Sequence, residues 1–232
     1  MTEIIPNIYQ VDGIRGCHVY VIVDNGITVI DTGMGGNAKK ILDMIKGLGY
    51  GPSDVKRIIV THDHMDHIGS LKALKDETKA VVMAGEADAD VIEGKKPMRV
   101  PKMPLPIGLL IPLLKPFFKS QPTPVDVRLK DGDKIPVLGE LLVVGLPGHS
   151  PGNIGLFSPS KKLLFSSDTL RMKGGEFTKP LNYDAEKAQS LTSIKKMGSL
   201  DYEIMLSGHN DPIMAGASKK VADYADKLSK EG

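Results

Sequence analysis

Short hydrophobic runs near the start of the chain have a pattern typical of β-strands. Residues 17–33, CHVYVIVDNGITVIDTG, contain two such runs on either side of Asn25-Gly26. Asn-Gly favours a tight hairpin because both residues tolerate positive φ. Residues 36–51 change to the spacing of an amphipathic helix, with apolar residues on one face and glycines at the end. This part of the chain therefore predicts a hairpin followed by a helix.

The alternation of strands and helices continues through most of the remaining sequence. Short apolar runs predict strands at residues 55–61, 79–85, 140–146, 153–159, 161–167 and 202–207. Helices are predicted at residues 69–77, 86–94, 184–200 and 217–232, and Asn182 or Asp184 is available to cap the third. Strands and helices thus alternate in two halves of similar order, which predicts an α/β fold.

Residues 95–130 interrupt this alternation. Eight of the chain's 16 prolines lie in this range, together with eight Lys or Arg residues and one acid, Asp126. Prolines at this density exclude a long regular helix and an internal strand. We therefore interpret the range as an inserted lid with short helical pieces, within a single domain that spans residues 1–232.

The composition is that of a globular protein and excludes several functional classes. Of 232 residues, 41% are hydrophobic and 25% are charged, and the net charge of +2 gives no general field for nucleic acid. The single cysteine, Cys17, excludes an internal disulfide. No apolar run is long enough for a membrane span, and no signal peptide is apparent. We expect a cytoplasmic enzyme.

Most of the histidines follow a predicted strand and precede a turn that contains glycine. They are His62, His64, His67, His149 and His209, and Asp168 has the same setting. Strands that end in this way can deliver their loops to one edge of a sheet, and imidazole with carboxylate is a donor set for zinc, iron or manganese. The pattern predicts a metal site, whereas His18, inside a predicted strand, is interpreted as a solvated or hydrogen-bonded residue.

The spacing within THDHMDHIG, residues 61–69, predicts two groups of ligands. His62 and His64 are two positions apart and point to the same side of an extended backbone. Asp66 and His67 follow where the chain turns into a helix, so they face a second point in space. Asp66 also lies near the helix N-terminus, where negative charge is favoured.

The complete pattern resembles that of the metallo-β-lactamase superfamily. The resemblance rests on HDHMDH at residues 62–67, LPGHSPGNIG around His149, LFSSDTL around Asp168, LSGH ending at His209, and an earlier VIDTG that contains Asp31. Within the superfamily the pattern is similar to the glyoxalase II and lactonase branch. The resemblance implies a four-layer αββα sandwich, in which two mixed sheets are flanked by helices and the site lies at one sheet edge.

The resemblance also implies two divalent ions, zinc in the first place, with iron or manganese as alternatives. The implied ligands of one ion are His62, His64 and His149. Those of the other are Asp66, His67 and His209. Asp168 would bridge the two, and a hydroxide between the ions would attack the substrate. Asp66 is a hypothetical proton relay to the leaving group, and Asp31 is expected to orient a ligating imidazole.

The expected substrate is an ester, thioester or lactone with an apolar acyl portion, and lactams or phosphoesters are possible side substrates. Residues 95–130 support this expectation, because Phe117, Phe118 and other apolar side chains lie among lysines that would form the rim of a pocket. The alternative roles of the segment are packing on the sheet, a dimer contact and, less favoured, a membrane-surface element. Arg171 is a further candidate for substrate contact, at a position where lactone hydrolases carry tyrosine.

Two other functions stay open on the sequence alone. A mononuclear iron oxygenase of the same fold would act on sulfur compounds, and a non-catalytic binding protein would retain the site without turnover. His64 stands where a di-iron electron-transfer branch has a carboxylate, which favours hydrolysis. Only 23 residues follow His209, so the helical extension that binds glutathione in glyoxalase II enzymes is not expected. Ser150, Asn153 and Thr169 lie beside candidate ligands and are interpreted as turn residues.

Overall fold

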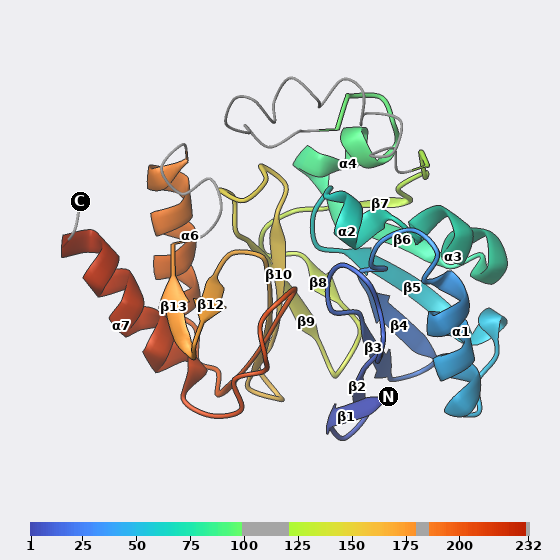
Figure 1. The fold of residues 1–232 in the computed structure, drawn as a ribbon, viewed down its shortest axis with the longest axis horizontal. Helices are drawn as coiled ribbons and strands as arrows, with labels where there is room; N and C mark the ends of the chain where they lie inside the picture. Colours follow the sequence, from blue (N-terminus) through green and yellow to red (C-terminus); the bar gives the residue numbers. More distant parts are fainter. Residues whose placement is uncertain (99–120, 180–185, 231–232) are drawn as a thin grey trace.

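Two β-sheets pack face to face in the computed structural model, which describes residues 1–98, 121–179 and 186–230 (Figure 1). The larger sheet contains seven strands in chain order: β1 (Thr2–Ile5), β2 (Ile8–Gln10), β3 (Tyr20–Val23), β4 (Ile27–Ile30), β5 (Val55–Val60), β6 (Val81–Gly85) and β7 (Val127–Leu129). Strands β1 to β4 pair antiparallel, and β4 to β7 pair parallel. Parallel neighbours need long crossover connections, which place helices beside this sheet.

The smaller sheet has the strand order β14 (Ile204–Ser207), β11 (Leu163–Ser167), β10 (Ile154–Ser158), β9 (Leu141–Gly145) and β8 (Lys134–Ile135). Strands β11 and β14 are parallel, and the other neighbours are antiparallel. A separate hairpin is formed by β12 (Arg171–Lys173) and β13 (Glu176–Thr178).

Helices cover the outer faces of both sheets. On the side of the larger sheet lie α1 (Ala38–Gly47), the 3-10 turn η1 (Pro52–Asp54), α2 (Met65–Ile68), α3 (Leu71–Thr78) and α4 (Glu86–Ile92). On the side of the smaller sheet lie α6 (Lys187–Gly198) and α7 (Ala217–Lys230) (Figure 1). The predicted αββα sandwich is thus confirmed. Among the helices of the described ranges, none is long and apolar enough to cross a bilayer.

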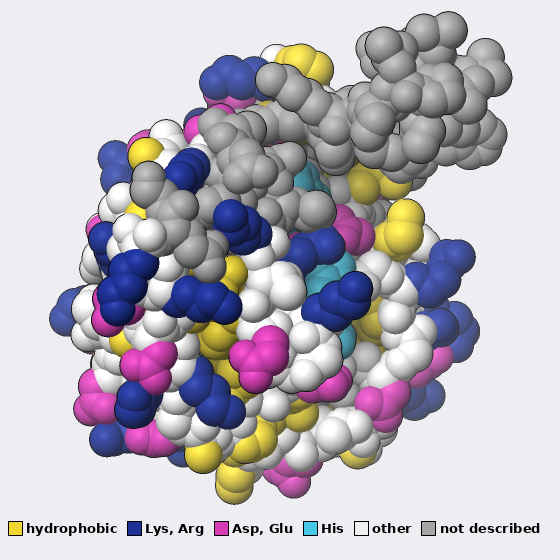
Figure 2. Space-filling view, turned by 60° about the vertical axis from the view of Figure 1, so that its left-hand side comes forward, with side chains coloured by type: hydrophobic (Ala, Val, Ile, Leu, Met, Phe, Trp, Pro, Cys, Tyr) yellow, Lys and Arg dark blue, Asp and Glu magenta, His cyan; other side chains and the backbone are white. Residues whose placement is uncertain are grey.

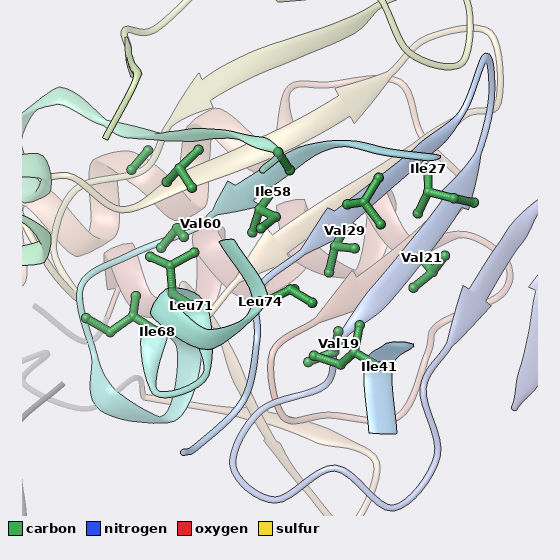
Figure 3. Close-up of a cluster of buried hydrophobic side chains, with 14 of the residues drawn as sticks. Val19, Val21, Ile27, Val29, Ile41, Ile58, Val60, Ile68, Leu71 and Leu74 are labelled. Carbon is green, nitrogen blue, oxygen red and sulfur yellow. The ribbon is translucent and has the colours of Figure 1, made fainter. Parts of the chain in front are cut away.

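Consecutive residues of the central strands face different parts of the core. Val29 and Ile58 point toward helices α1 to α3 and belong to the buried cluster drawn in Figure 3. Their neighbours Ile30 and Ile59 belong to a second cluster between the two sheets. This follows from the two-residue period of a strand, and it explains why these strands are apolar at successive positions rather than at every second one. Each such side chain contributes roughly 1.5–3 kcal/mol when fully buried.

The predicted hairpin turn at Asn25-Gly26 is confirmed, with φ of 50° and 103° at the two residues. The range predicted as an insertion needs a correction at its end, because residues 127–129 form β7. This strand lies at the edge of the larger sheet, next to β6, and contains no proline, so it does not conflict with the proline-rich sequence before it. Residues 99–120, which include Phe117 and Phe118, lie outside the described residues, as do Asn182 and Asp184.

The side chain of Tyr202 is fully buried in the core against α6 and α7. Within the described ranges its hydroxyl has no hydrogen-bond partner. A buried unpaired polar group costs roughly 1–3 kcal/mol, so Tyr202→Phe is expected to raise the free energy of unfolding by about 1 kcal/mol. Denaturant titration measures this change.

The control for this substitution is Tyr20→Phe. The hydroxyl of Tyr20 donates to the carbonyl of Ser207 at 2.7 Å, so its removal is expected to lower the free energy of unfolding by about 1 kcal/mol. Equal losses in both variants would show that the Tyr202 hydroxyl is paired in solution.

Candidate metal centre

Loops from both sheets meet at one edge of the sandwich and bring the candidate ligands together. Each candidate follows a strand or begins a short helix: His62 and His64 after β5, Asp66 and His67 on α2, His149 after β9, Asp168 after β11 and His209 after β14. Strands β4 and β5 run parallel, as do β11 and β14. Parallel strands end at the same edge, so the topology of each sheet delivers its loops to this centre.

Three histidines form the first donor group. The Nε2 atom of His149 lies 3.2 Å from His62 Nε2 and 3.0 Å from His64 Nδ1. Burial lowers the pKa of His62 and His64, and that of His149 to about 3. The three rings are therefore uncharged near neutral pH. Their converging nitrogen lone pairs fit a cation such as zinc, which neutral imidazole binds.

Asp66, His67 and His209 form the second donor group, with ligand atoms within 4.8 Å of one another. His209 Nε2 lies 3.2 Å from Asp66 Oδ2 and 3.0 Å from Asp168 Oδ2. Hydrogen bonds to these two carboxylates raise the pKa of His209 to about 9. Burial by itself would raise the pKa of Asp66, but the hydrogen bond from His209 and nearby charge hold it at about 2.

Asp168 lies between the two groups. Its Oδ2 is 3.0 Å from His209 Nε2 and 3.7 Å from His149 Nε2, while Oδ1 is 3.5 Å from His67 Nε2. Among the described residues, neither Asp168 Oδ1 nor His67 Nε2 has a hydrogen-bond partner, although both are buried. Buried polar atoms are normally paired, so a cation between them fits this site. The residues present therefore suit the metal ions that the resemblance implies.

The residues on either side of the Asp168 carboxylate have features that accommodate it: a positive φ at Ser167 and the absence of a side chain at Gly208. Ser167 has a φ of 53°, a backbone conformation that residues other than glycine adopt rarely. This conformation turns the chain at the end of β11, directly before Asp168. A Cβ atom on Gly208 would lie 2.1 Å from Asp168 Oδ1 and 2.9 Å from His67 Cε1. Gly208 thus leaves space for the carboxylate between the two donor groups.

Polar side chains behind the candidate ligands lie within hydrogen-bond distance of two of the rings. Asp31 Oδ2 lies 2.8 Å from His67 Nδ1, and Asp31 also accepts hydrogen bonds from the backbone and hydroxyl of Thr61, each at 2.8 Å. Asp31 thus contacts one of the candidate ligands, His67. Ser167 Oγ lies 3.2 Å from His62 Nδ1 and donates to Asn153 Oδ1 at 2.6 Å. Thr61 and Ser167 were not predicted; the only sequence signal is that each directly precedes a candidate ligand.

The other residues singled out in the sequence have different surroundings. Asn153 donates to Thr169 Oγ1 at 2.9 Å, and Ser150 donates to Asp88, so these side chains are bound within the protein. His18 Nδ1 lies 3.3 Å from the carbonyl oxygen of Ser207, and His18 belongs to none of the donor clusters formed by the described residues.

Arg171 lies at the start of β12, close enough to the centre for its charge to help burial lower the pKa of His149. Asn210 holds this strand beside the loop of His209, since it accepts from the backbone of Met172 at 2.8 Å and donates to the Leu170 carbonyl at 3.0 Å. Figure 2 shows histidine side chains that reach the surface on one face, with both basic and acidic side chains beside them.

Comparison with known proteins places the chain in one family. Residues 12–209 match the model of the metallo-beta-lactamase superfamily. The chain is 26% identical over 249 residues to the probable metallo-hydrolase YflN of Bacillus subtilis, covering 99% of this chain and 90% of that protein. It is 25% identical over 216 residues to the hydroxyacylglutathione hydrolase GloC of Haemophilus influenzae, covering 93% of this chain and 94% of that protein.

Solved structures show the same relationship. A subclass B3 metallo-beta-lactamase of Bradyrhizobium japonicum superposes with a TM-score of 0.71 at 26% identity, over 99% of this chain and 90% of that one. A metallo-beta-lactamase family protein of Thermus thermophilus shares the fold, with a TM-score of 0.72 at 19% identity over 99% and 80% of the two chains. With a family match that spans most of its length, the chain belongs to the metallo-beta-lactamase superfamily.

Proposed function

We propose that this protein is a hydrolase with two divalent ions, zinc in the first place, that cleaves an ester, thioester or lactone-type bond in a small molecule. The position of Asp168 carries the proposal, because its Oδ2 lies between His149 of one donor group and His209 of the other. A carboxylate shared in this way suits a pair of ions acting on one substrate. The similarity to a hydroxyacylglutathione hydrolase and to a probable metallo-hydrolase supports the reaction class.

Asp66 and Asp31 have different proposed roles in hydrolysis. When bound, the ions supply Lewis acidity, which activates water and polarises the substrate carbonyl. Asp66, with a pKa of about 2 and a side chain 35% exposed, is ionised and reachable from solvent. We assign it the transfer of a proton between the attacking water and the leaving group because of its exposed position at the centre, and not because of its pKa. Asp31 holds Nδ1 of His67, which keeps Nε2 of that ring directed at Asp168.

The proposed substrate combines an apolar acyl portion with an electrophilic carbonyl. Arg171 supplies positive charge beside the centre, which suits a substrate with an anionic group. Phe117 and Phe118, the predicted apolar substrate residues of the 95–130 segment, lie outside the described residues. Lactams and phosphoesters are proposed as side substrates, since the same Lewis acidity serves both.

Elemental analysis of the purified protein, combined with a panel of ester, thioester, lactone, lactam and phosphodiester substrates, tests the proposed function. We expect about two ions per chain and hydrolysis of at least one carbonyl substrate. One iron per chain with oxygen uptake would instead establish an iron oxygenase. Full metal content without turnover of any substrate would establish a binding protein.

Asp168→Ala tests the bridge between the two donor groups. Because both groups would lose the shared carboxylate, we expect the metal content to fall from about two ions per chain to about one. Asp43→Ala is the control, since Asp43 is an exposed residue that pairs with Lys39 on α1. Unchanged metal content in the Asp168 variant would contradict the bridging role.

A further inference from the structure

A buried carboxylate outside the ligand set connects the two loops that carry the three histidines. Asp88, near the start of α4, has no solvent exposure. Its Oδ1 accepts a hydrogen bond from the backbone of Gly152 at 2.8 Å. Its Oδ2 accepts from the hydroxyl of Ser150 and from the backbone of Asp63 at 3.3 Å. One side chain therefore binds three donors from two distant parts of the chain.

These donors belong to the two halves of the sandwich. Asp63 lies between His62 and His64 in the loop after β5 of the larger sheet. The other two donors, Ser150 and Gly152, lie one and three positions after His149, in the loop after β9 of the smaller sheet. The three histidine nitrogens converge to 3.0 and 3.2 Å only if the two loops keep this relative position.

Two glycines allow the loops and α4 to approach closely. A Cβ atom on Gly152 would lie 2.4 Å from the backbone nitrogen of Asp88, and one on Gly85 would lie 2.0 Å from the carbonyl oxygen of Gly152. Neither glycine has positive φ, so each is required by the lack of space rather than by its backbone conformation. The loop of His149 thus lies directly on the start of α4, where Asp88 can reach its backbone.

We propose that Asp88 is a positioning residue for the three-histidine group. It fixes the loop of His149 against the loop of His62 and His64, and so sets the distances between the three ligand nitrogens. Asp88 acts through the backbone and Ser150 rather than on the ligands themselves. The inference rests on the proposed function only in that the three-histidine group binds a metal ion; it does not depend on the substrate.

Asp88→Asn tests this role. An amide offers one acceptor oxygen and an NH2 group, so in either orientation at least one of the two backbone N–H groups faces a donor instead of an acceptor. We expect the zinc affinity of the three-histidine group to fall about 10–100-fold, the usual range for residues that support metal ligands from behind. Zinc binding is measured by chelator competition, and the visible spectrum of the cobalt-loaded protein reports the ligand geometry. Both are measured on the full chain in a His209→Asn background, which isolates this group.

The control is Asp24→Asn, because Asp24 also accepts from the backbone of a distant loop, at Leu138, but lies at the opposite end of β4 from Asp31. We expect this variant to keep the zinc affinity and the cobalt spectrum of the background. An Asp88 variant that is folded and binds zinc within twofold of the background would overturn the proposal, and so would equal losses in both variants. If the His209→Asn protein without further changes does not bind zinc, the result contradicts the proposed metal centre itself and not only the role of Asp88.

A milder variant decides the question if Asp88→Asn does not fold. Ser150→Ala removes one of the three donors and leaves both backbone contacts of Asp88 in place. We expect a threefold to tenfold loss of zinc affinity, roughly the effect of one hydrogen bond, with a changed cobalt spectrum and a folded metal-free protein. Zinc affinity equal to that of the background would then overturn the proposal.

Discussion

Gly208→Ala is expected to weaken metal binding at least about 100-fold and to abolish hydrolysis. The added methyl group would lie 2.1 Å from Asp168 Oδ1 and 2.9 Å from His67 Cε1, far inside van der Waals contact. The buried carboxylate would have to leave its place between His149 and His209. Both donor groups would then lose the carboxylate that lies between them. Calorimetric zinc titration and substrate turnover measure the two effects.

The matched control for this substitution is Gly47→Ala. Gly47 is the last residue of α1, and a Cβ atom there meets nothing within 4 Å. Alanine favours a helix over glycine by up to about 1 kcal/mol, so the control is expected to keep full metal binding with equal or higher stability. Gly208 does not have positive φ, so alanine introduces no backbone strain there. Wild-type zinc affinity in the Gly208 variant would show that Asp168 does not occupy this position in solution.

The sequence was sufficient to predict most strands and the loops that follow them. Apolar runs such as residues 55–60 end directly in polar residues, and this change marks the end of β5 next to His62. Because strand ends in an α/β fold meet at one edge, a list of strands also predicts which side chains gather there. The convergence of the candidate ligands is therefore a consequence of local pattern and topology.

The supporting residues could not be predicted in the same way. Asp88 lies in EADADVIEG, where acids in the first turn of a helix are expected to be exposed and to interact favourably with the helix dipole. Only the packing of α4 on the loop of His149 shows that this acid is buried, and that loop lies about 60 residues further along the chain. The position of β7 also depends on pairing with β6, because three residues carry too little pattern to predict a strand.

The two donor groups differ in their affinity for protons. Burial holds the pKa of His149 at about 3, so this ring does not bind a proton near neutral pH. Hydrogen bonds to Asp168 and Asp66 raise the pKa of His209 to about 9, so this ring is protonated in the metal-free protein. A metal ion needs the lone pair of Nε2 and must displace that proton. Protons therefore compete with metal in the second group and not in the first.

The number of bound ions is thus expected to rise with pH. Zinc binding to the second group displaces a proton from His209 and also from His67, whose pKa lies well above its usual value because the charges around it, Asp31 and Asp168 among them, outweigh the effect of burial. Below the pKa of His209, the zinc affinity of this group therefore increases at least about tenfold per pH unit. The affinity of the three-histidine group stays constant over this range, since the pKa of His149 is about 3. A chelator buffer can fix the free zinc concentration between the dissociation constants that the two groups have at pH 6. Under this condition we expect about one ion per chain at pH 6 and about two at pH 9.

The control for this pH series is His209→Asn, which removes one titrating ring and one candidate ligand of the second group while the chelator buffer stays the same. We expect this variant to bind about one ion per chain at both pH values, because Asn210 and the β12 strand that it holds remain in place. Two ions at pH 6 in the wild-type protein would show that the second group is not protonated. A second ion gained at pH 9 by the variant would assign the pH dependence to residues other than His209.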